Sequence, residues 1–436
     1  MMKKRIGKAA LILLSSVFLG ILLLVIVFSL PVNSARTHVK DSIYPMVDIL
    51  NDDAGDLQRK YFLNLKENFT DCLMVQNGLE KVQGKSLIEH AMYIYHYDLS
   101  NNETWLTEES LKQFSQYGEE GMFLREYSKY WHGYLVWLKP LLMCFSWKTA
   151  ETVWMVLQIL LLLFVVAFSF YKKQGSLGLG LIVALLFMKP VSIWISFAMC
   201  VCWGIVVFAV LGLLIWYQKL ERKKEQENYF LLIGILTSYM DFLTYPIVTL
   251  GIPLCLYLVL NQEEHMTCLR RLIKVFWMGV LWAVGYIGMW GMKWVCAELL
   301  CQSGTLRNAV WSVIYRTTPL DGHQSAFSGI SRTVDAIFSQ YDSEVYAIGF
   351  GILLVATLLS IVWCMIKARD LDWSITLVCL SVVALLPFAW LVVTQNHTAI
   401  HCVFTFRIMG VTIFALWCML VCSLRTIKRK KSKYDK

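Results

Sequence analysis

Residues 11–28 read LILLSSVFLGILLLVIVF and follow a basic start at Lys3, Lys4 and Arg5. A helix needs about 20 apolar residues to cross the hydrocarbon core of a bilayer, and this segment is close to that length. It is longer than the core of a cleaved signal peptide, which holds about 7–15 apolar residues. We therefore predict that residues 1–30 form an uncleaved signal-anchor transmembrane helix whose basic start is cytoplasmic.

The composition indicates that a bilayer is the solvent for most of the chain. Of 436 residues, 57% are hydrophobic and only 16% are charged, and the mean hydropathy is +0.56. A soluble protein of this size needs far more charge to cover its surface. The net charge of +9 comes from short basic runs beside apolar segments, which is typical of membrane topology, and we expect no nucleic-acid partner.

Polar segments of two kinds alternate between the apolar runs. The basic ones are residues 3–5, 172–173, 222–224, 270–271, 367–369 and 428–431, and the others, rich in Asp, His, Tyr and Trp, are 68–71, 130–134, 241–246 and 396–401. Cytoplasmic loops carry the excess of Lys and Arg. We predict a multi-pass protein of the cell membrane with both termini cytoplasmic. The four other clusters then share the extracytoplasmic side, where we expect one site.

The lengths of the apolar segments define the predicted fold. We expect an all-α polytopic membrane protein of about ten transmembrane helices, with a large helical first extracytoplasmic loop and a second long external loop. The predicted parts are the signal anchor (1–30), the extracytoplasmic loop with interfacial helices (31–148), the central transmembrane bundle (149–293), the second extracytoplasmic loop (294–343), and the C-terminal transmembrane helices with a basic cytoplasmic tail (344–436). With this count, every strongly basic loop falls on one side.

Two acidic positions are candidates for catalysis. Asp71 follows Asn68, Phe69 and Thr70, and apolar neighbours raise the pKa of a carboxyl group toward the range of a general base. A turn or a helix N-cap is the alternative, since these residue types favour both. Asp241 lies between two short apolar runs, where an ionisable group is costly and marks a site. An aspartate that faces water at the membrane edge is the alternative there.

Histidine and arginine candidates lie near the C-terminal spans. His397 and His401 are four residues apart and share one face of a helix. With a carboxylate from another loop they can hold a divalent cation, the one cofactor that the sequence suggests. They can instead donate hydrogen bonds to a phosphate or be structural. Arg407 lies just inside the next span, so its guanidinium needs an anionic partner, either Asp241 or a ligand phosphate.

The aromatic cluster at 130–134 contains Trp131, His132 and Tyr134. Aromatic faces stack on sugar rings or pack against lipid, so all three are candidate substrate-binding residues. An aromatic belt at the membrane interface explains the Trp and the Tyr but not the His. Lys139 and Arg125, which flank this cluster, are candidate contacts for a lipid phosphate.

With these clusters in these places, the chain resembles the class C glycosyltransferases. Those are multi-span enzymes with a large first external loop that carries an acidic catalytic residue. The clusters are also similar to those of uncharacterised multi-span membrane proteins of Gram-positive bacteria. The resemblance covers the whole architecture. It implies a polyprenyl-phosphate sugar donor at the membrane lipid and a glycan or protein acceptor of the cell envelope.

The resemblance also implies roles for individual residues. Asp71 would deprotonate the acceptor hydroxyl, with Asp52 and Asp53 as alternatives. Arg407, with either Arg316 or Lys139, would neutralise the leaving lipid phosphate.

A transporter or flippase of a lipid-linked or anionic substrate is the alternative function. A transport pathway crosses the bilayer, so it requires ionisable residues near the middle of several spans. The candidates here gather at one side of the predicted bundle, which favours a transferase. A non-catalytic scaffold is a third hypothesis, for which no interaction motif is apparent.

Overall fold

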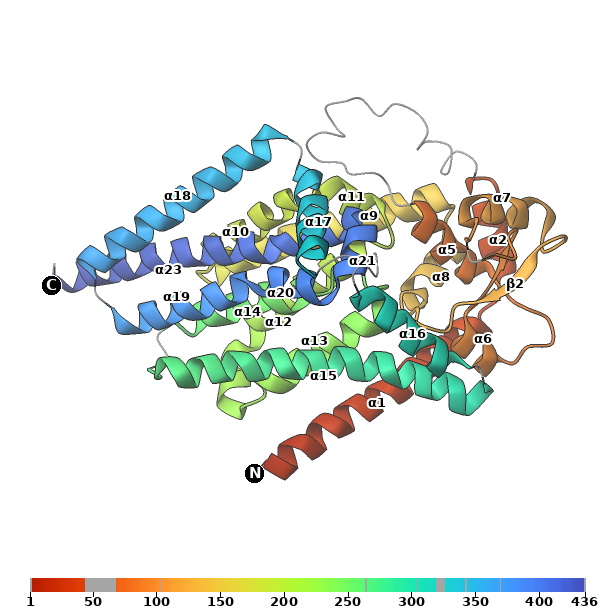
Figure 1. Cartoon of the computed structure of the whole chain (residues 1–436), viewed down its shortest axis with the longest axis horizontal. Coiled ribbons are helices and arrows are strands. Elements are labelled where there is room, and N and C mark those ends of the chain that lie inside the picture. The colour runs from red at the N-terminus through yellow and green to blue at the C-terminus, as the bar shows by residue number, and fades with distance from the viewer. Residues whose placement is uncertain are drawn as a thin grey trace.

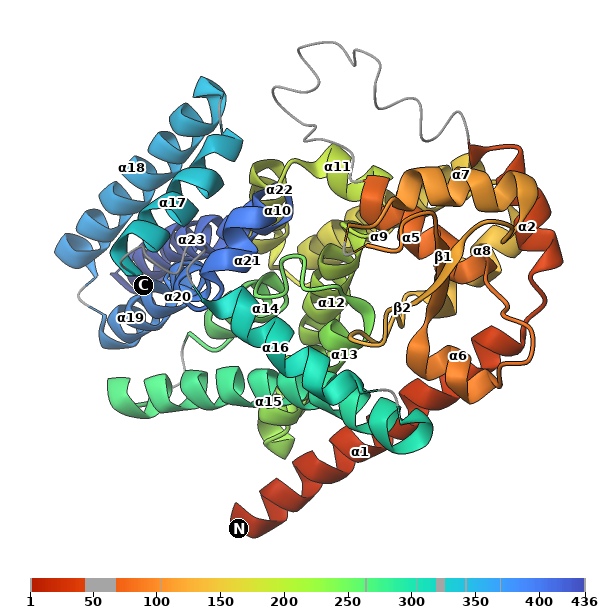
Figure 2. The same ribbon diagram turned by 45° about the vertical axis from the view of Figure 1, so that its right-hand side comes forward.

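The computed structural model describes residues 2–43, 68–102, 104–262, 265–302, 304–318, 326–341, 343–368 and 370–434. It is a bundle of long helices with a smaller unit at one end (Figure 1). The smaller unit, orange to gold in Figures 1 and 2, covers the ends of several bundle helices. We call this unit, residues 68–146, the loop unit.

Seven helical segments of the described chain are long and apolar enough to cross a membrane, and two of these segments join consecutive helices. Five are α1 (Met2–Ser29), α9 (Trp147–Tyr171), α12 (Cys200–Lys223), α15 (Cys268–Cys301) and α18 (Glu344–Lys367). The sixth joins α19 (Leu371–Ala384) and α20 (Leu386–Val393), and the seventh, Cys402–Lys431, runs from α22 (Cys402–Thr405) into α23 (Gly410–Tyr434). Helices pair their backbone groups internally, which is the requirement for crossing hydrocarbon. The predicted class, a polytopic helical membrane protein, is confirmed.

Three of the ten predicted spans are shorter than a bilayer is thick. α10 (Gly175–Phe187) and α14 (Val248–Leu260) have 13 residues each, and α13 (Gln226–Met240) has 15. At about 1.5 Å per residue these helices measure about 20–23 Å, against about 30 Å of hydrocarbon. The helix lengths therefore do not confirm the count of ten, which stays a prediction.

Ion pairs gather several basic segments at the end of the bundle away from the loop unit, where the C-terminus lies (Figure 1). The pairs are Arg5–Glu227, Lys8–Glu225, Lys274–Glu221 and Arg429–Asp370. They join the starts of α1 and α15 and the end of α23 to neighbouring helix ends. We call this end of the bundle the basic end. Part of the charge sorting seen in the sequence is thus also present in space.

The loop unit surrounds a two-stranded antiparallel ribbon. Its elements are α5 (Asn68–Leu79), α6 (Leu87–Tyr93), β1 (Tyr95–Asp98), α7 (Thr107–Tyr117), β2 (Phe123–Glu126) and α8 (Leu135–Cys144), and α2 (Asn33–Lys40) packs against α8. In the ribbon Tyr95 pairs with Glu126 and Asp98 with Phe123. The ribbon was not predicted, because four-residue strands are too short for an alternating pattern to stand out.

Residues 129–134 fasten the loop unit to the bundle. Trp131 Nε1 donates to the carbonyl of Met289 on α15 (2.6 Å), and the Gly133 backbone N–H donates to the carbonyl of Tyr239 on α13 (2.9 Å). A Cβ at position 133 would lie 2.3 Å from the Tyr239 ring, so glycine is required for this approach. We call residues 129–134 the docking segment.

Shorter helices lie on the same side as the loop unit. They are α11 (Pro190–Ile195), α16 (Thr305–Thr317), α17 (Ala326–Phe338), α21 (Gln395–Ile400) and α22 (Cys402–Thr405), with 3₁₀ turns at Ser339–Tyr341 and Phe406–Met409. α21 packs against both α16 and α17. The segment predicted as a second external loop is therefore largely helical where it is described, and α15 continues into it as far as Cys301.

Helices α13 and α15 pack backbone to backbone through two glycines. A Cβ at Gly234 would lie 2.1 Å from the Trp282 carbonyl oxygen, and one at Gly285 would lie 2.3 Å from the Leu231 carbonyl oxygen. Small residues allow such approach in a membrane, where helix association depends on close packing because lipid is as apolar as the helices. This contact fixes the two helices that hold the docking segment.

We predict that Gly285→Ala destabilises the protein and that Gly279→Ala, on the same helix, does not. A Cβ at position 279 meets nothing within 4 Å, so alanine adds only its helix propensity, about 1 kcal/mol. At position 285 the new Cβ must displace a backbone, and overpacking of this kind costs about 1–3 kcal/mol. Thermal unfolding of the detergent-purified variants measures the difference. Equal unfolding midpoints would contradict the glycine contact.

Candidate functional site

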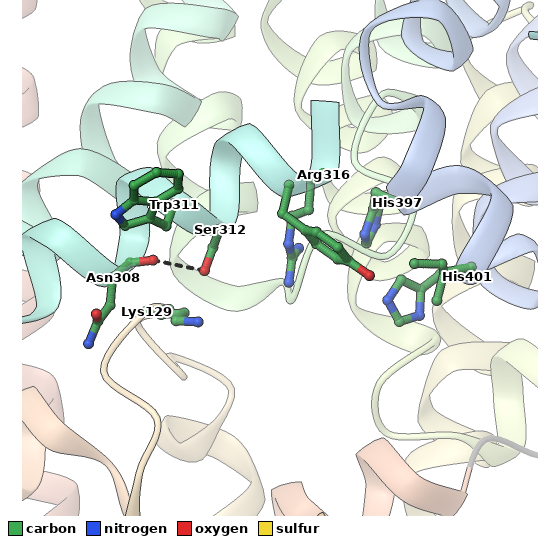
Figure 3. Close-up of a pocket in the computed structure, with 9 residues that line it drawn as sticks. Lys129, Asn308, Trp311, Ser312, Arg316, His397 and His401 are labelled. Carbon is green, nitrogen blue, oxygen red and sulfur yellow. Dashed lines mark hydrogen bonds between the residues drawn. The ribbon is translucent and has the colours of Figure 1, made fainter. Parts of the chain in front are cut away.

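Two cavities meet at the loop-unit end of the bundle. The first, of about 460 Å³, is lined by Lys129, Asn308, Trp311, Ser312, Tyr315, Arg316, His397, Ile400 and His401. The second, of about 420 Å³, is lined by Phe69, Thr70, Leu73, Tyr127, Phe242, Leu243, Thr244, Arg316, His397, Ile400, His401, Val403 and Phe404. We call the first the polar cavity and the second the apolar cavity. Arg316, His397 and His401, all predicted site residues, contact both and form the junction (Figure 3).

Helix α21 carries His397, whose orientation is set by one hydrogen bond. Its Nε2 lies 2.7 Å from the carbonyl oxygen of Leu243. A carbonyl only accepts, so Nε2 donates its proton and Nδ1 bears the lone pair. Nδ1 is buried and has no hydrogen-bond partner among the described residues. Burial, and then the charge of Arg316, holds the pKa of His397 well below its usual value, so the imidazole is neutral.

Asp241 builds the turn that presents the Leu243 carbonyl. Its carboxylate accepts hydrogen bonds from the backbone N–H of Thr244 (2.9 Å) and from the Thr244 hydroxyl. Between them, Leu243 has a φ of 68°, a left-handed conformation that costs about 1–2 kcal/mol in a residue with a Cβ. Asp241 is buried, which raises its pKa, and it lines neither cavity. It acts on the site through His397, as a positioning residue.

His401 lies close to His397, with ring centroids 4.7 Å apart. Burial, and then the charge of Arg316, lowers the pKa of His401 to about 4, so it is also neutral near pH 7. Within the described parts of the chain, no three His, Cys, Asp or Glu side chains form a group that could hold a metal ion. The predicted divalent cation would need a carboxylate beside this pair, and the described residues bring none there.

Arg316 and Lys129 give the junction a positive charge. Arg316 Nη1 is buried without a hydrogen-bond partner in the described chain, and the guanidinium lies 5.6 Å from the ring centroid of Tyr130. Burial, and then the charge of Arg316, lowers the pKa of Lys129, so the two cations repel each other. Neither forms an ion pair with any described residue. Both side chains are partly buried, and a partly buried pair of cations without a carboxylate favours an anionic ligand.

Most residues that line the polar cavity were not predicted from the sequence. Its lining residues on α16 are Asn308, Trp311, Ser312, Tyr315 and Arg316. Their spacing of three, four, seven and eight residues places them on one helix face, a signal that was present in the sequence. No such spacing in the sequence points to Lys129. It reaches the cavity because its carbonyl accepts hydrogen bonds from Trp290 (2.7 Å) and Trp294 (2.9 Å), which hold the docking segment on α15.

Asp71 is fully buried and lines neither cavity, although Thr70 and Leu73 beside it on α5 line the apolar cavity. Its carboxylate accepts hydrogen bonds from the hydroxyl of Ser196 (3.1 Å) and from the backbone N–H groups of Phe197 (3.2 Å) and Ala198 (2.9 Å). It thereby ties the start of α5 to the turn before α12. Its contacts with the described residues indicate a structural role, but not the N-cap or local turn that was the alternative, because Asp71 lies within α5 and these partners are at 196–198. The alternatives Asp52 and Asp53 lie outside the described residues.

The residues of the predicted aromatic cluster also form hydrogen bonds within the protein interior. His132 contacts the Tyr127 carbonyl through Nε2 (3.0 Å) and the Tyr134 hydroxyl through Nδ1 (2.8 Å), and that hydroxyl donates to Asn77 (3.1 Å). Trp131 holds the docking segment on α15. None of the three predicted residues, Trp131, His132 and Tyr134, lines either cavity.

The remaining predicted cations are buried elsewhere. Lys139 on α8 lies 5.5 Å from the ring centroid of Phe28. Arg407 donates to the carbonyl of Val403 (2.5 Å), and its guanidinium lies 4.6 Å from the Phe406 ring centroid. Neither cation lines the polar or the apolar cavity, and Arg407 forms no ion pair with the predicted partner Asp241 in the structure.

Comparisons with known proteins identify no family. No protein-family model, no curated protein and no solved structure matches the chain.

We predict that Asp71→Asn lowers the stability of the protein by about 1–3 kcal/mol, because an amide N–H₂ would face two buried backbone N–H groups. Asp335→Asn on α17, where the side chain is exposed, is the matched control and should leave the unfolding midpoint unchanged. Thermal unfolding in detergent measures both. An Asp71→Asn protein of unchanged stability that loses ligand binding would instead make Asp71 a direct site residue.

Proposed function

We propose that the junction binds the phosphate of a lipid-linked sugar and that the protein transfers this sugar to an acceptor on the side of the loop unit. The observation that supports this most directly is the cation pair Arg316 and Lys129. It lies where a polar cavity meets an apolar one, and no described carboxylate balances it. A phosphate would relieve the repulsion between the two cations and fill the vacant hydrogen-bonding position of Arg316.

The two cavities suit the two halves of such a donor. The apolar cavity has Leu73, Val403 and Phe404 in its wall, side chains that suit the first units of a polyprenyl chain. The polar cavity offers Trp311, on which a sugar ring can stack, and Asn308, which can donate and accept hydrogen bonds. In this arrangement the sugar–phosphate bond lies beside His397 and His401.

The proposed reaction is a displacement at the anomeric carbon. The acceptor oxygen forms a bond to this carbon, the bond from carbon to phosphate oxygen breaks, and its electron pair leaves with the polyprenyl phosphate. Nδ1 of His397 takes the acceptor proton. A bound phosphate offsets the charge of Arg316, which raises the pKa of the imidazole and makes it a better base. Arg316 and Lys129 stabilise the charge on the leaving phosphate.

A flippase of the same lipid is the alternative. It would bind the phosphate at the same junction, but it needs a polar pathway through the bundle. Both larger cavities lie at the loop-unit end, which supports a reaction at one membrane face. Proteoliposomes that move the bound lipid across the bilayer without cleaving it would replace the transferase proposal with the flippase.

The first test of this proposal is phosphate binding. We expect the purified protein to bind decaprenyl phosphate and not decaprenol, measured by quenching of tryptophan fluorescence. Arg316→Gln should weaken binding about 10–100-fold, because a hydrogen bond to a charged group contributes about 1.5–3 kcal/mol. Arg307→Gln changes an exposed arginine on the same helix and should bind as the parent protein does. Equal affinity for the phosphate and the alcohol would exclude the proposed site.

The second test separates proton transfer from binding. His397→Gln keeps an amide that can donate to the Leu243 carbonyl but removes the base. We expect release of decaprenyl phosphate from a panel of decaprenyl-phosphate hexoses to fall about 10²–10⁴-fold, while the affinity for decaprenyl phosphate changes little. His265→Gln, at the opposite end of the bundle, is the control. A His397→Gln protein with full turnover would remove His397 from the proposed chemistry.

A further inference from the structure

A third cavity, of about 170 Å³, lies at the basic end of the bundle. It is enclosed by the turn between α9 and α10, the end of α14 and the end of α23. Along α23, fifteen residue steps separate Gly410, the first residue of the helix, from Arg425 in this cavity, a rise of about 22 Å. Residues of the segment before Gly410 line the two larger cavities. The cavity therefore belongs to the other face of the protein, and the proposed transfer reaction does not use it.

One positive charge in this cavity is not balanced. Arg429 is paired with Asp370 (2.9 Å). Arg425, one turn earlier on α23, donates to the hydroxyl of Ser176 (3.1 Å) and forms no ion pair within the described residues. Its guanidinium is only half-buried, so it keeps donors for a group that enters the cavity. An anion, and a phosphate above all, suits a planar guanidinium.

The other polar groups narrow the choice of ligand. Gln262 donates to the Thr426 hydroxyl (2.8 Å), and both side chains are buried. The amide oxygen of Gln174 is also buried, but it has no hydrogen-bond partner among the described residues. A buried acceptor without a donor is costly. The ligand that completes the cavity therefore carries an anionic group for Arg425 and a donor, such as a hydroxyl, for Gln174.

Neighbouring side chains indicate that this ligand is a lipid. Leu424 precedes Arg425 and is 45% exposed, and Leu179, one turn after the start of α10, is 42% exposed. α10 and α23 pack against each other (Figure 1). Exposed leucines on bundle helices face acyl chains when the solvent is a bilayer. A headgroup in the cavity would leave its chains beside such residues.

We propose that this cavity binds the headgroup of an anionic glycerophospholipid, in the leaflet at the basic end. Arg425 contacts the phosphodiester, and Gln174 accepts a hydrogen bond from a headgroup hydroxyl. Basic pockets between membrane helices are suited to such headgroups.

Native mass spectrometry of the delipidated full-length protein tests this site. Phosphatidylglycerol, phosphatidylcholine and inorganic phosphate are titrated separately. We expect phosphatidylglycerol to bind at least tenfold more tightly than phosphatidylcholine. Arg425→Gln should remove this preference, and Arg425→Lys should restore part of it. Lys428→Gln, which changes an exposed cation on the same helix, should leave it intact.

A second variant keeps the test decisive if Arg425→Gln folds poorly. Gln174→Trp lies on a different segment, fills the cavity and leaves Arg425 in place, and it should also reduce phosphatidylglycerol binding about tenfold. Equal affinity for the two lipids in the parent protein, or an unchanged preference in Gln174→Trp and Arg425→Gln, would overturn the proposal. Displacement of phosphatidylglycerol by equimolar inorganic phosphate would also overturn it, by identifying a free-anion site.

Discussion

Backbone N–H and C=O groups find no water inside a bilayer, and this constraint orders the whole structure. The long helices satisfy it internally. The segments at 188–199, 241–247 and 394–409 contain only short helices and turns, so they satisfy it less completely. The middle segment is hydrogen-bonded to both of the others, since the Tyr245 hydroxyl donates to the Met199 carbonyl and His397 donates to the Leu243 carbonyl. Residues of the segment at 394–409 line both of the larger cavities, and residues 242–244 line the apolar cavity.

The proposed site depends on contacts between the loop unit and the bundle. The docking segment brings Lys129 from the loop unit to the cavity that Arg316 of α16 also lines, and tryptophans of α15 hold the segment there. Close packing of α13 on α15 supports the same contact, because the Gly133 backbone N–H donates to α13 and the Trp131 side chain donates to α15. The cation pair is therefore a property of the assembled protein, and neither part possesses it alone.

Residues of the site are predictable from the sequence where both the residue type and the spacing along a helix point to a site. The histidine pair was predicted from helical spacing and lies at the junction. Asp71 was predicted from its residue type, its apolar neighbours and a family resemblance, yet its carboxylate accepts hydrogen bonds from a distant turn at 196–198. The prediction for Asp241 is an intermediate case, because Asp241 shapes the turn that orients His397 but lines neither cavity. A polar residue that stabilises a buried turn and one that meets a ligand look alike in sequence.

The sequence by itself determined that this is a helical membrane protein with polar clusters between its apolar segments. Hydropathy and helical period are properties of neighbouring residues, so they can be recognised without a structure. Only the tertiary structure decided which polar groups meet, how long the short helices are and which cations lack a counter-charge. Those features depend on contacts between residues far apart in the chain, where burial and the partner across the contact decide what each group can do.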